Sequence, residues 1–139
     1  MKYDKEDSES NNFSKIRTIV VEDDIELREL FVELLRAYNI EVVGTGSNGK
    51  EAEELYQIHH PDVVFMDISM PLYDGYYGIG RIKEHDKNAK IIVMSGPSED
   101  PLVFGMYEGL EFIEKPIDMK KIGNTVNKLM GDAIKAQMK

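Results

Sequence analysis

The chain has 139 residues, and 42% of them are hydrophobic, which is enough to build one continuous core in a single domain. Asp and Glu outnumber Lys and Arg by 26 to 17, for a formal net charge of −9. Because an acidic surface repels phosphate backbones and anionic lipid, we expect binding to neither nucleic acid nor a membrane surface. The absence of cysteine excludes disulfides, thiolate metal sites and cysteine nucleophiles.

The start of the chain is charged and polar, without the apolar segment of a secretory signal. We expect residues 1–14 to form a disordered acidic tail. One domain then covers residues 15–131, and a helical tail follows over residues 132–139. No apolar run approaches the length of about 18 residues that a membrane span needs, so we expect a cytoplasmic protein.

Five short apolar segments alternate with helical patterns from residue 17 onward. These segments are continuous and rich in β-branched residues, which is typical of strands buried on both faces of a parallel sheet. We expect strands at residues 18–21, 40–43, 62–66, 91–94 and 110–114. The second is less apolar, so we expect it near an edge. The alternation of strands and helices predicts an α/β fold with a parallel sheet and right-handed crossovers.

Four helices are expected between and after these strands. In the first, apolar residues recur at the spacing of one helix face, at Leu27, Leu30, Phe31, Leu34 and Leu35. The second spans residues 49–58 with Asn48 as its N-cap, and the last follows the fifth strand. The third, over residues 76–84, is the weakest because Gly78 and Gly80 each cost about 1 kcal/mol relative to Ala.

The segment between the fourth and fifth strands is expected to form a shortened or irregular helix over residues 97–108. Pro97 and Pro101 lack an N–H group, so they fit only turns or the first turn of a helix. Gly105 further lowers the helix propensity of the segment.

Polar side chains follow four of the expected strands at the point where each strand ends. They are Glu22, Asp23 and Asp24 after the first strand, Asp67 after the third, Ser95 after the fourth and Lys115 after the fifth. The carboxyl ends of parallel strands share one edge of a sheet, and ligands bind there where the strand order reverses. If the order is 2-1-3-4-5, Glu22, Asp23 and Asp67 converge on one pocket.

Three carboxylates in one pocket repel one another, so the cluster needs positive charge nearby. Lys115 supplies one charge, and Mg²⁺ suits a site made of carboxylates, a backbone carbonyl and waters. Such a cation also supports phosphoryl transfer, because it binds phosphate oxygens and screens charge on the transferring group. A carboxylate can itself be the nucleophile and become an aspartyl-phosphate. Asp67 lies centrally in the cluster and is the candidate for this nucleophile.

These residues lie in segments that resemble the receiver domain of two-component response regulators, of the single-domain, CheY-like type seen in chemotaxis signalling. The resemblance covers the chain from about Ile16 to Met130. The matching segments occur in the family's order and nearly at its spacing: Val21–Asp24, Asp62–Pro71 with Asp74–Gly75, Met94–Gly96 and Phe112–Pro116.

The resemblance implies a flavodoxin-like fold, with a five-stranded parallel sheet in the order 2-1-3-4-5 and helices on both faces. It also implies a cis peptide bond before Pro116, and a role for each matching position. Asp67 is the phosphoacceptor, Lys115 pairs with the phosphate, and Ser95 and Phe112 form the switch. The implied metal site for Mg²⁺ comprises Glu22, Asp23, Asp67 and the backbone carbonyl of Ser69.

The implied function is a phosphorylation-dependent signalling switch, not an enzyme with a substrate of its own. The phosphoryl group comes from a sensor histidine kinase or a phosphotransfer protein, and the output is binding to a downstream protein target. We expect a monomer or a weak dimer.

Two other functions also use a parallel α/β sheet. A phosphatase that forms an aspartyl-phosphate carries a second Asp two residues after its nucleophile, where this sequence has Ser69. An FMN-binding flavodoxin-like domain needs a phosphate-binding loop after the first strand, where Glu22, Asp23 and Asp24 repel phosphate instead. The phosphatase is the closer alternative.

Overall fold

The computed structural model describes residues 15–96 and 105–138, with side chains through residue 131. Two expectations therefore fall wholly or mainly on residues outside the described part. They are the disordered tail over residues 1–14 and the short helix over residues 97–108, of which only residues 105–108 are described. Among the described residues, no helix is both long enough and apolar enough to cross a membrane.

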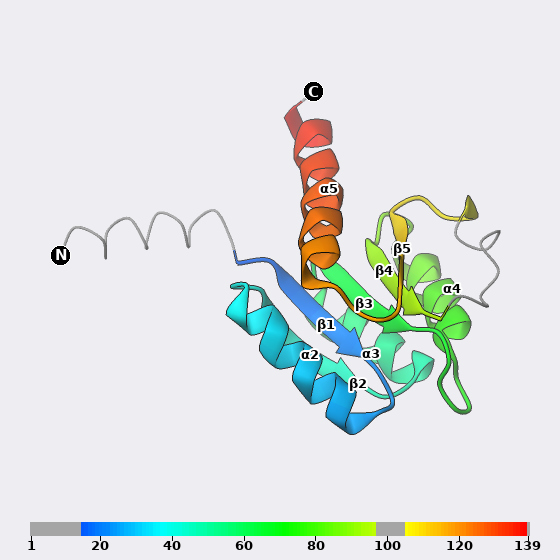
Figure 1. Ribbon diagram of the computed structural model, residues 1–139. Helices are drawn as coiled ribbons and strands as arrows, with labels where there is room; N and C mark the ends of the chain where they lie inside the picture. Colours follow the sequence, from blue (N-terminus) through cyan, green and yellow to red (C-terminus); the bar gives the residue numbers. More distant parts are fainter. Residues whose placement is uncertain (1–14, 97–104, 139) are drawn as a thin grey trace.

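The centre of the fold is a five-stranded parallel sheet in the order β2-β1-β3-β4-β5, as expected (Figure 1). The less apolar second strand lies at an edge. The strands are β1 (Arg17–Val21), β2 (Glu41–Gly46), β3 (Val63–Asp67), β4 (Ile91–Ser95) and β5 (Leu110–Glu114). The third and fourth strands each extend one residue past their predicted ends, because Asp67 and Ser95 still pair with neighbouring strands.

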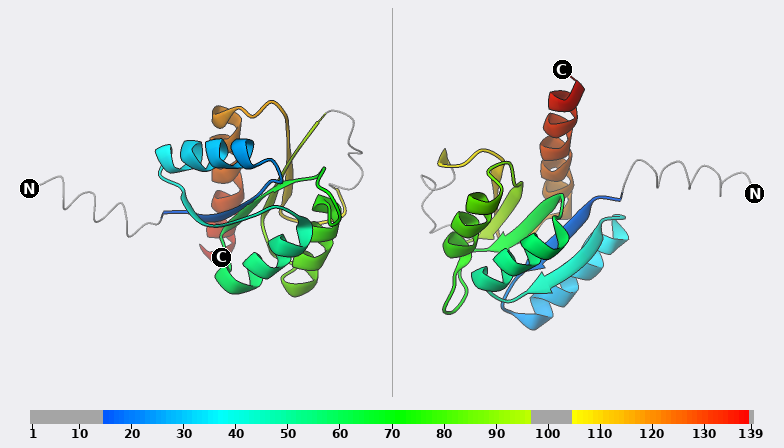
Figure 2. Two further views of the ribbon diagram at one scale, coloured as in Figure 1. Left: turned by 90° about the horizontal axis from the view of Figure 1, so that it is seen from below. Right: turned by 180° about the vertical axis from the view of Figure 1, so that it is seen from behind.

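The described helices form a layer on each face of the sheet (Figure 2). They are α2 (Ile25–Ala37), α3 (Gly49–His59), α4 (Gly75–His85) and α5 (Met119–Met138). Successive strand residues point to opposite faces, so Val20 and Phe65 pack with α2 and α5. Val21 and Met66 pack with α3 and α4. Each face of the sheet thus has its own apolar core, which packs the helices of that face against the strands.

Each helix that follows β1, β2 or β3 begins at a side chain that caps it. Asp24, Asn48 and Asp74 accept hydrogen bonds from the backbone N–H groups three residues later. Such a cap satisfies one of the N–H groups that have no partner within a helix. The caps therefore fix where each chain segment leaves the carboxyl edge of the sheet.

Helix α4 is complete despite its glycines, which the sequence pattern alone made the weakest prediction. A Cβ atom on Gly75 would lie 2.3 Å from the carbonyl oxygen of Asp67, and one on Gly49 would lie 2.8 Å from the nitrogen of Gly78. Glycine is therefore required where α4 meets the end of β3 and the start of α3. Gly80 has no such neighbour.

The inward face of α2 is narrower than its sequence pattern suggested. Phe31 and Leu35 are buried, but Leu27 and Leu30 are 47% and 54% exposed. These two leucines lie on the side of the helix that faces the loop after β5, where they border a groove next to the acidic residues.

Candidate functional site

The turn after β1 holds two of the acidic side chains at the carboxyl edge of the sheet. The Glu22 N–H donates to the carbonyl of Gly46 at 3.0 Å, which continues the pairing of β1 with β2 by one residue. The Asp24 N–H donates to Oε2 of Glu22 at 3.1 Å, and the Asp24 carboxylate caps α2. Asp23 therefore projects between two anchored residues.

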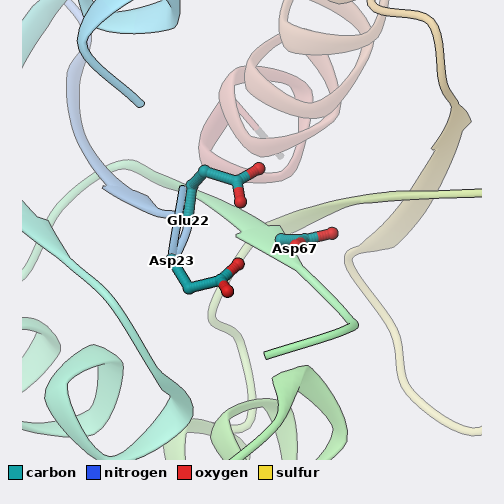
Figure 3. Close-up of side chains that lie close together, drawn as sticks. All are labelled: Glu22, Asp23 and Asp67. Carbon is teal, nitrogen blue, oxygen red and sulfur yellow. The ribbon is translucent and has the colours of Figure 1, made fainter. Parts of the chain in front are cut away.

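Asp67 is the last residue of β3, the neighbour of β1 in the sheet. It is only 3% exposed. Carboxylate oxygens of Glu22, Asp23 and Asp67 all lie within 4.8 Å of one another. Figure 3 shows the three side chains beside each other at the ends of these two strands. The structure thus brings together the three carboxylates that the sequence places up to 45 residues apart, counting from 22 to 67.

Lys115 adds a positive charge to the cluster from the end of β5, the strand at the opposite edge of the sheet from β2. It follows β5, and its backbone N–H donates to the carbonyl of Ser95 at 2.8 Å. Its Nζ lies 3.2 Å from Oδ1 of Asp67 and 3.4 Å from Oε1 of Glu22. The Lys115–Pro116 peptide bond is cis, as the resemblance implied.

The charges of the cluster do not balance. Three mutually close carboxylates face one ammonium group, so negative charge is in excess. Burial raises the pKa of Glu22, with a further rise from the charge of Asp67. Burial alone would lower the pKa of Lys115, but the charges of Asp67 and Glu22 raise it. The Lys115 ammonium is thus protonated at neutral pH, and the cluster still attracts a further cation.

The donor atoms fit a hard divalent cation. Carboxylate oxygens are the ligands that Mg²⁺ and Ca²⁺ prefer, and Mg²⁺ needs only one or two of them because it keeps several waters. Asp23 is exposed beside the buried Asp67, so a hydrated ion can reach both. The residues present therefore fit Mg²⁺.

The remaining predicted site residues lie around this cluster. Ser95 ends β4 and is 2% exposed, and its hydroxyl donates to the carbonyl of Gly96 at 3.4 Å. Phe112 lies in β5 opposite Val93 and is 37% exposed. Ser69 is exposed in the loop between β3 and α4. The carboxylates and Lys115 thus form the charged centre of the site, and Ser69, Ser95 and Phe112 lie on the strands and the loop around it.

One residue at the site has no counterpart among the sequence predictions. Arg28 of α2 donates from Nη1 to the carbonyl of Glu22 at 3.0 Å and to that of Gly46 at 3.5 Å. Its partners are backbone oxygens, and a sequence pattern does not identify backbone partners. The sequence feature that could have pointed to Arg28 is its position one helical turn after the cap at Asp24, which places it near the end of β1.

An apolar groove opens directly beside the cluster. Its volume is about 270 Å³, and Glu22 and Lys115 line it together with side chains of α2, β4 and the loop after β5. The apolar lining residues are Leu27, Leu30, Phe31, Leu34, Met94, Pro116 and Ile117. A protein surface that docks here is brought next to Asp67.

Comparison with known proteins shows which proteins this chain is similar to. Residues 18–127 match the family model described as the response regulator receiver domain. The chain is 33% identical over 116 residues to the chemotaxis protein CheY of Bacillus subtilis. That alignment covers 82% of this chain and 97% of the relative.

Solved structures show the same similarity. A chain of the CheX–CheY–BeF3–Mg²⁺ complex from Borrelia burgdorferi superposes with a TM-score of 0.75 at 27% identity, covering 83% of this chain and 89% of that one. The response regulator protein TrrA of Thermotoga maritima, in complex with Mg²⁺ and BeF, gives a TM-score of 0.73 at 31% identity. There the coverage is 82% of this chain and 98% of that one.

The geometry predicts unequal roles for the two adjacent aspartates in metal binding. Asp23→Asn should weaken Mg²⁺ binding by about tenfold or more, because it removes a carboxylate of the cluster. Asp24→Asn is the matched control: it removes the same charge and keeps a good N-cap. Isothermal titration with Mg²⁺ measures both. Equal losses of affinity in the two variants would contradict this assignment.

Proposed function

The chain belongs to the response regulator receiver domain family, and we propose that Asp67 is the side chain through which it accepts a phosphoryl group. The protein is a phosphorylation-dependent signalling switch of the CheY-like type. The observation that supports Asp67 most strongly is its place at the centre of the cluster. It is buried, it pairs with Lys115, and it lies next to Glu22 and Asp23.

In the proposed reaction, a carboxylate oxygen of Asp67 attacks the phosphorus of the donor. An O–P bond forms to Asp67, and the bond from phosphorus to the donor's nitrogen or oxygen breaks, with its electron pair leaving on the donor. Lys115 Nζ, 3.2 Å from Asp67, is placed to pair with the new phosphoryl oxygens.

We assign Glu22, Asp23, Asp67 and the backbone carbonyl of Ser69 to the metal site. When bound there, Mg²⁺ supplies positive charge that offsets the carboxylates and the incoming phosphoryl oxygens. Asp23 and Asp67 would hold the ion, and the Glu22 carboxylate beside them would add negative charge to the site. The raised pKa of Glu22 fits a group whose charge is costly until a cation arrives.

The output of the switch depends on Ser95 and Phe112. Phosphorylation adds acceptor oxygens next to β4, and the Ser95 hydroxyl exchanges its weak 3.4 Å contact with Gly96 for one of them. Ser95 pairs with Glu114 of β5, so its movement is transmitted to the strand that carries Phe112. A shift of Phe112 from its partly exposed position changes the surface that a downstream protein binds.

The phosphodonor in this proposal is a sensor histidine kinase or a phosphotransfer protein that docks in the groove beside the cluster. The half-exposed Leu27 and Leu30 give the donor an apolar contact, and Glu22 and Lys115 place its end next to Asp67. The output partner is a protein, and the chain works in the cytoplasm as a monomer or weak dimer. It turns over no substrate beyond its own phosphoryl group, since Ser69 stands where a phosphatase carries an acid.

The proposed domain limits are those expected from the sequence. The receiver domain spans residues 15–131, between an acidic tail over residues 1–14 and a helical tail over residues 132–139. The family match over residues 18–127 supports the central range.

The phosphoacceptor assignment is tested with a small-molecule donor. Incubation with acetyl phosphate and Mg²⁺ should add one phosphoryl group to the intact mass, labile to hydroxylamine as expected for an acyl phosphate. Asp67→Asn should abolish the gain, because the amide is not nucleophilic. A variant that still gains the phosphoryl group would show that another residue is the acceptor.

The role of the groove is tested by comparing a protein donor with a small one. Leu30→Arg should slow phosphorylation by a histidine kinase or phosphotransfer protein by about tenfold, because it places a charge in an apolar contact. The rate with acetyl phosphate should stay unchanged. Ile58→Arg, at an exposed apolar residue of α3, is the matched control. Equal rates for Leu30→Arg and the wild type with the protein donor would exclude docking in this groove.

A further inference from the structure

We propose that Arg28 is a positioning residue for the metal site, holding the peptide group that carries Asp23. The inference rests on the proposed function, since it concerns the same cluster of carboxylates. In the part of the chain that the structure describes, the Arg28 side chain donates to two backbone carbonyl oxygens and to none of the three carboxylates.

The side chain of Arg28 connects helix α2 to the ends of strands β1 and β2. Its own N–H donates to the carbonyl of Asp24 at 2.9 Å, so Arg28 lies one turn into α2. From there, Nη1 reaches back to the ends of β1 and β2, where it meets the carbonyls of Glu22 at 3.0 Å and Gly46 at 3.5 Å. The residue is partly buried, so water competes weakly for these bonds.

The contact with Glu22 controls Asp23 because a peptide group is planar. The Glu22 carbonyl and the Asp23 N–H belong to one rigid unit, so fixing the carbonyl oxygen fixes the direction in which the chain enters Asp23. The other anchors of the turn act elsewhere. The Glu22 N–H is bound to Gly46, and the Asp24 N–H is bound to the Glu22 side chain. Neither of these holds the peptide group between Glu22 and Asp23.

Two roles for Arg28 predict opposite changes in metal affinity. If Arg28 acted only as a positive charge near the cluster, its removal would make the site more negative and tighten Mg²⁺ binding. If it positions Asp23, its removal frees the peptide group and weakens Mg²⁺ binding. The direction of the change therefore separates the two roles.

The test compares Arg28→Met, Arg28→Lys and the wild type by isothermal titration with Mg²⁺ at low ionic strength. Arg28→Met keeps most of the side-chain stem but removes the donors, and we expect about tenfold weaker binding, the scale of one hydrogen bond to a charged group. Arg28→Lys keeps the charge with a less suitable donor, and we expect an intermediate affinity. Arg36→Met, on the exposed end of α2, is the control and should match the wild type.

Phosphorylation gives a second readout. With acetyl phosphate, Arg28→Met should be slow at limiting Mg²⁺ and should recover toward the wild-type rate at saturating Mg²⁺. Unchanged or tighter Mg²⁺ binding by Arg28→Met would overturn the inference. If that variant is unfolded by circular dichroism, wild-type affinity in Arg28→Lys overturns it equally. A wild-type protein that binds Mg²⁺ but gains no phosphoryl group would contradict the proposed function and leave the metal-affinity comparison intact.

Discussion

An excess of negative charge at one edge of a parallel sheet is the constraint that governs this site. The topology gives β1 and β3 adjacent carboxyl ends, so Glu22, Asp23 and Asp67 meet although they are distant in sequence. Lys115, which follows the edge strand β5, offsets only part of that charge. A site that is left short of positive charge binds a cation and, with it, an anionic phosphoryl group. The excess of carboxylate charge therefore lowers the stability of the fold and also makes the site bind a cation and respond to phosphorylation.

The surrounding structure holds these charges in place. Gly75 lets the start of α4 lie against the end of β3, which sets the loop that carries Ser69. The caps at Asp24 and Asp74 fix the exits from β1 and from that loop. Arg28 reaches the same edge from α2. Backbone contacts of this kind keep like charges close, which their mutual repulsion would otherwise prevent.

Much of this arrangement could be predicted from the sequence because its signals are local. Continuous apolar segments marked the strands, and the polar residues that end them marked the site. The strand order came from the resemblance to receiver domains. Three features depended on tertiary contacts. Gly75 is required by a carbonyl oxygen of another segment, Arg28 binds backbone oxygens, and the half-exposed Leu30 borders a groove completed by residues after β5. Helical periodicity shows which side of a helix is apolar, but not how far neighbouring elements cover it.

The most direct test of the charge imbalance is the stability of Asp23→Asn against urea, with and without Mg²⁺, at low ionic strength. Without Mg²⁺, the variant should unfold at a higher urea concentration than the wild type, because one repulsive charge is gone. Added Mg²⁺ should stabilise the wild type more than the variant, since binding to the folded state alone raises its stability. The difference between the two midpoints should therefore narrow or reverse as Mg²⁺ increases. A metal-free Asp23→Asn protein that is less stable than the wild type, or equal stabilisation of both by Mg²⁺, would contradict the account.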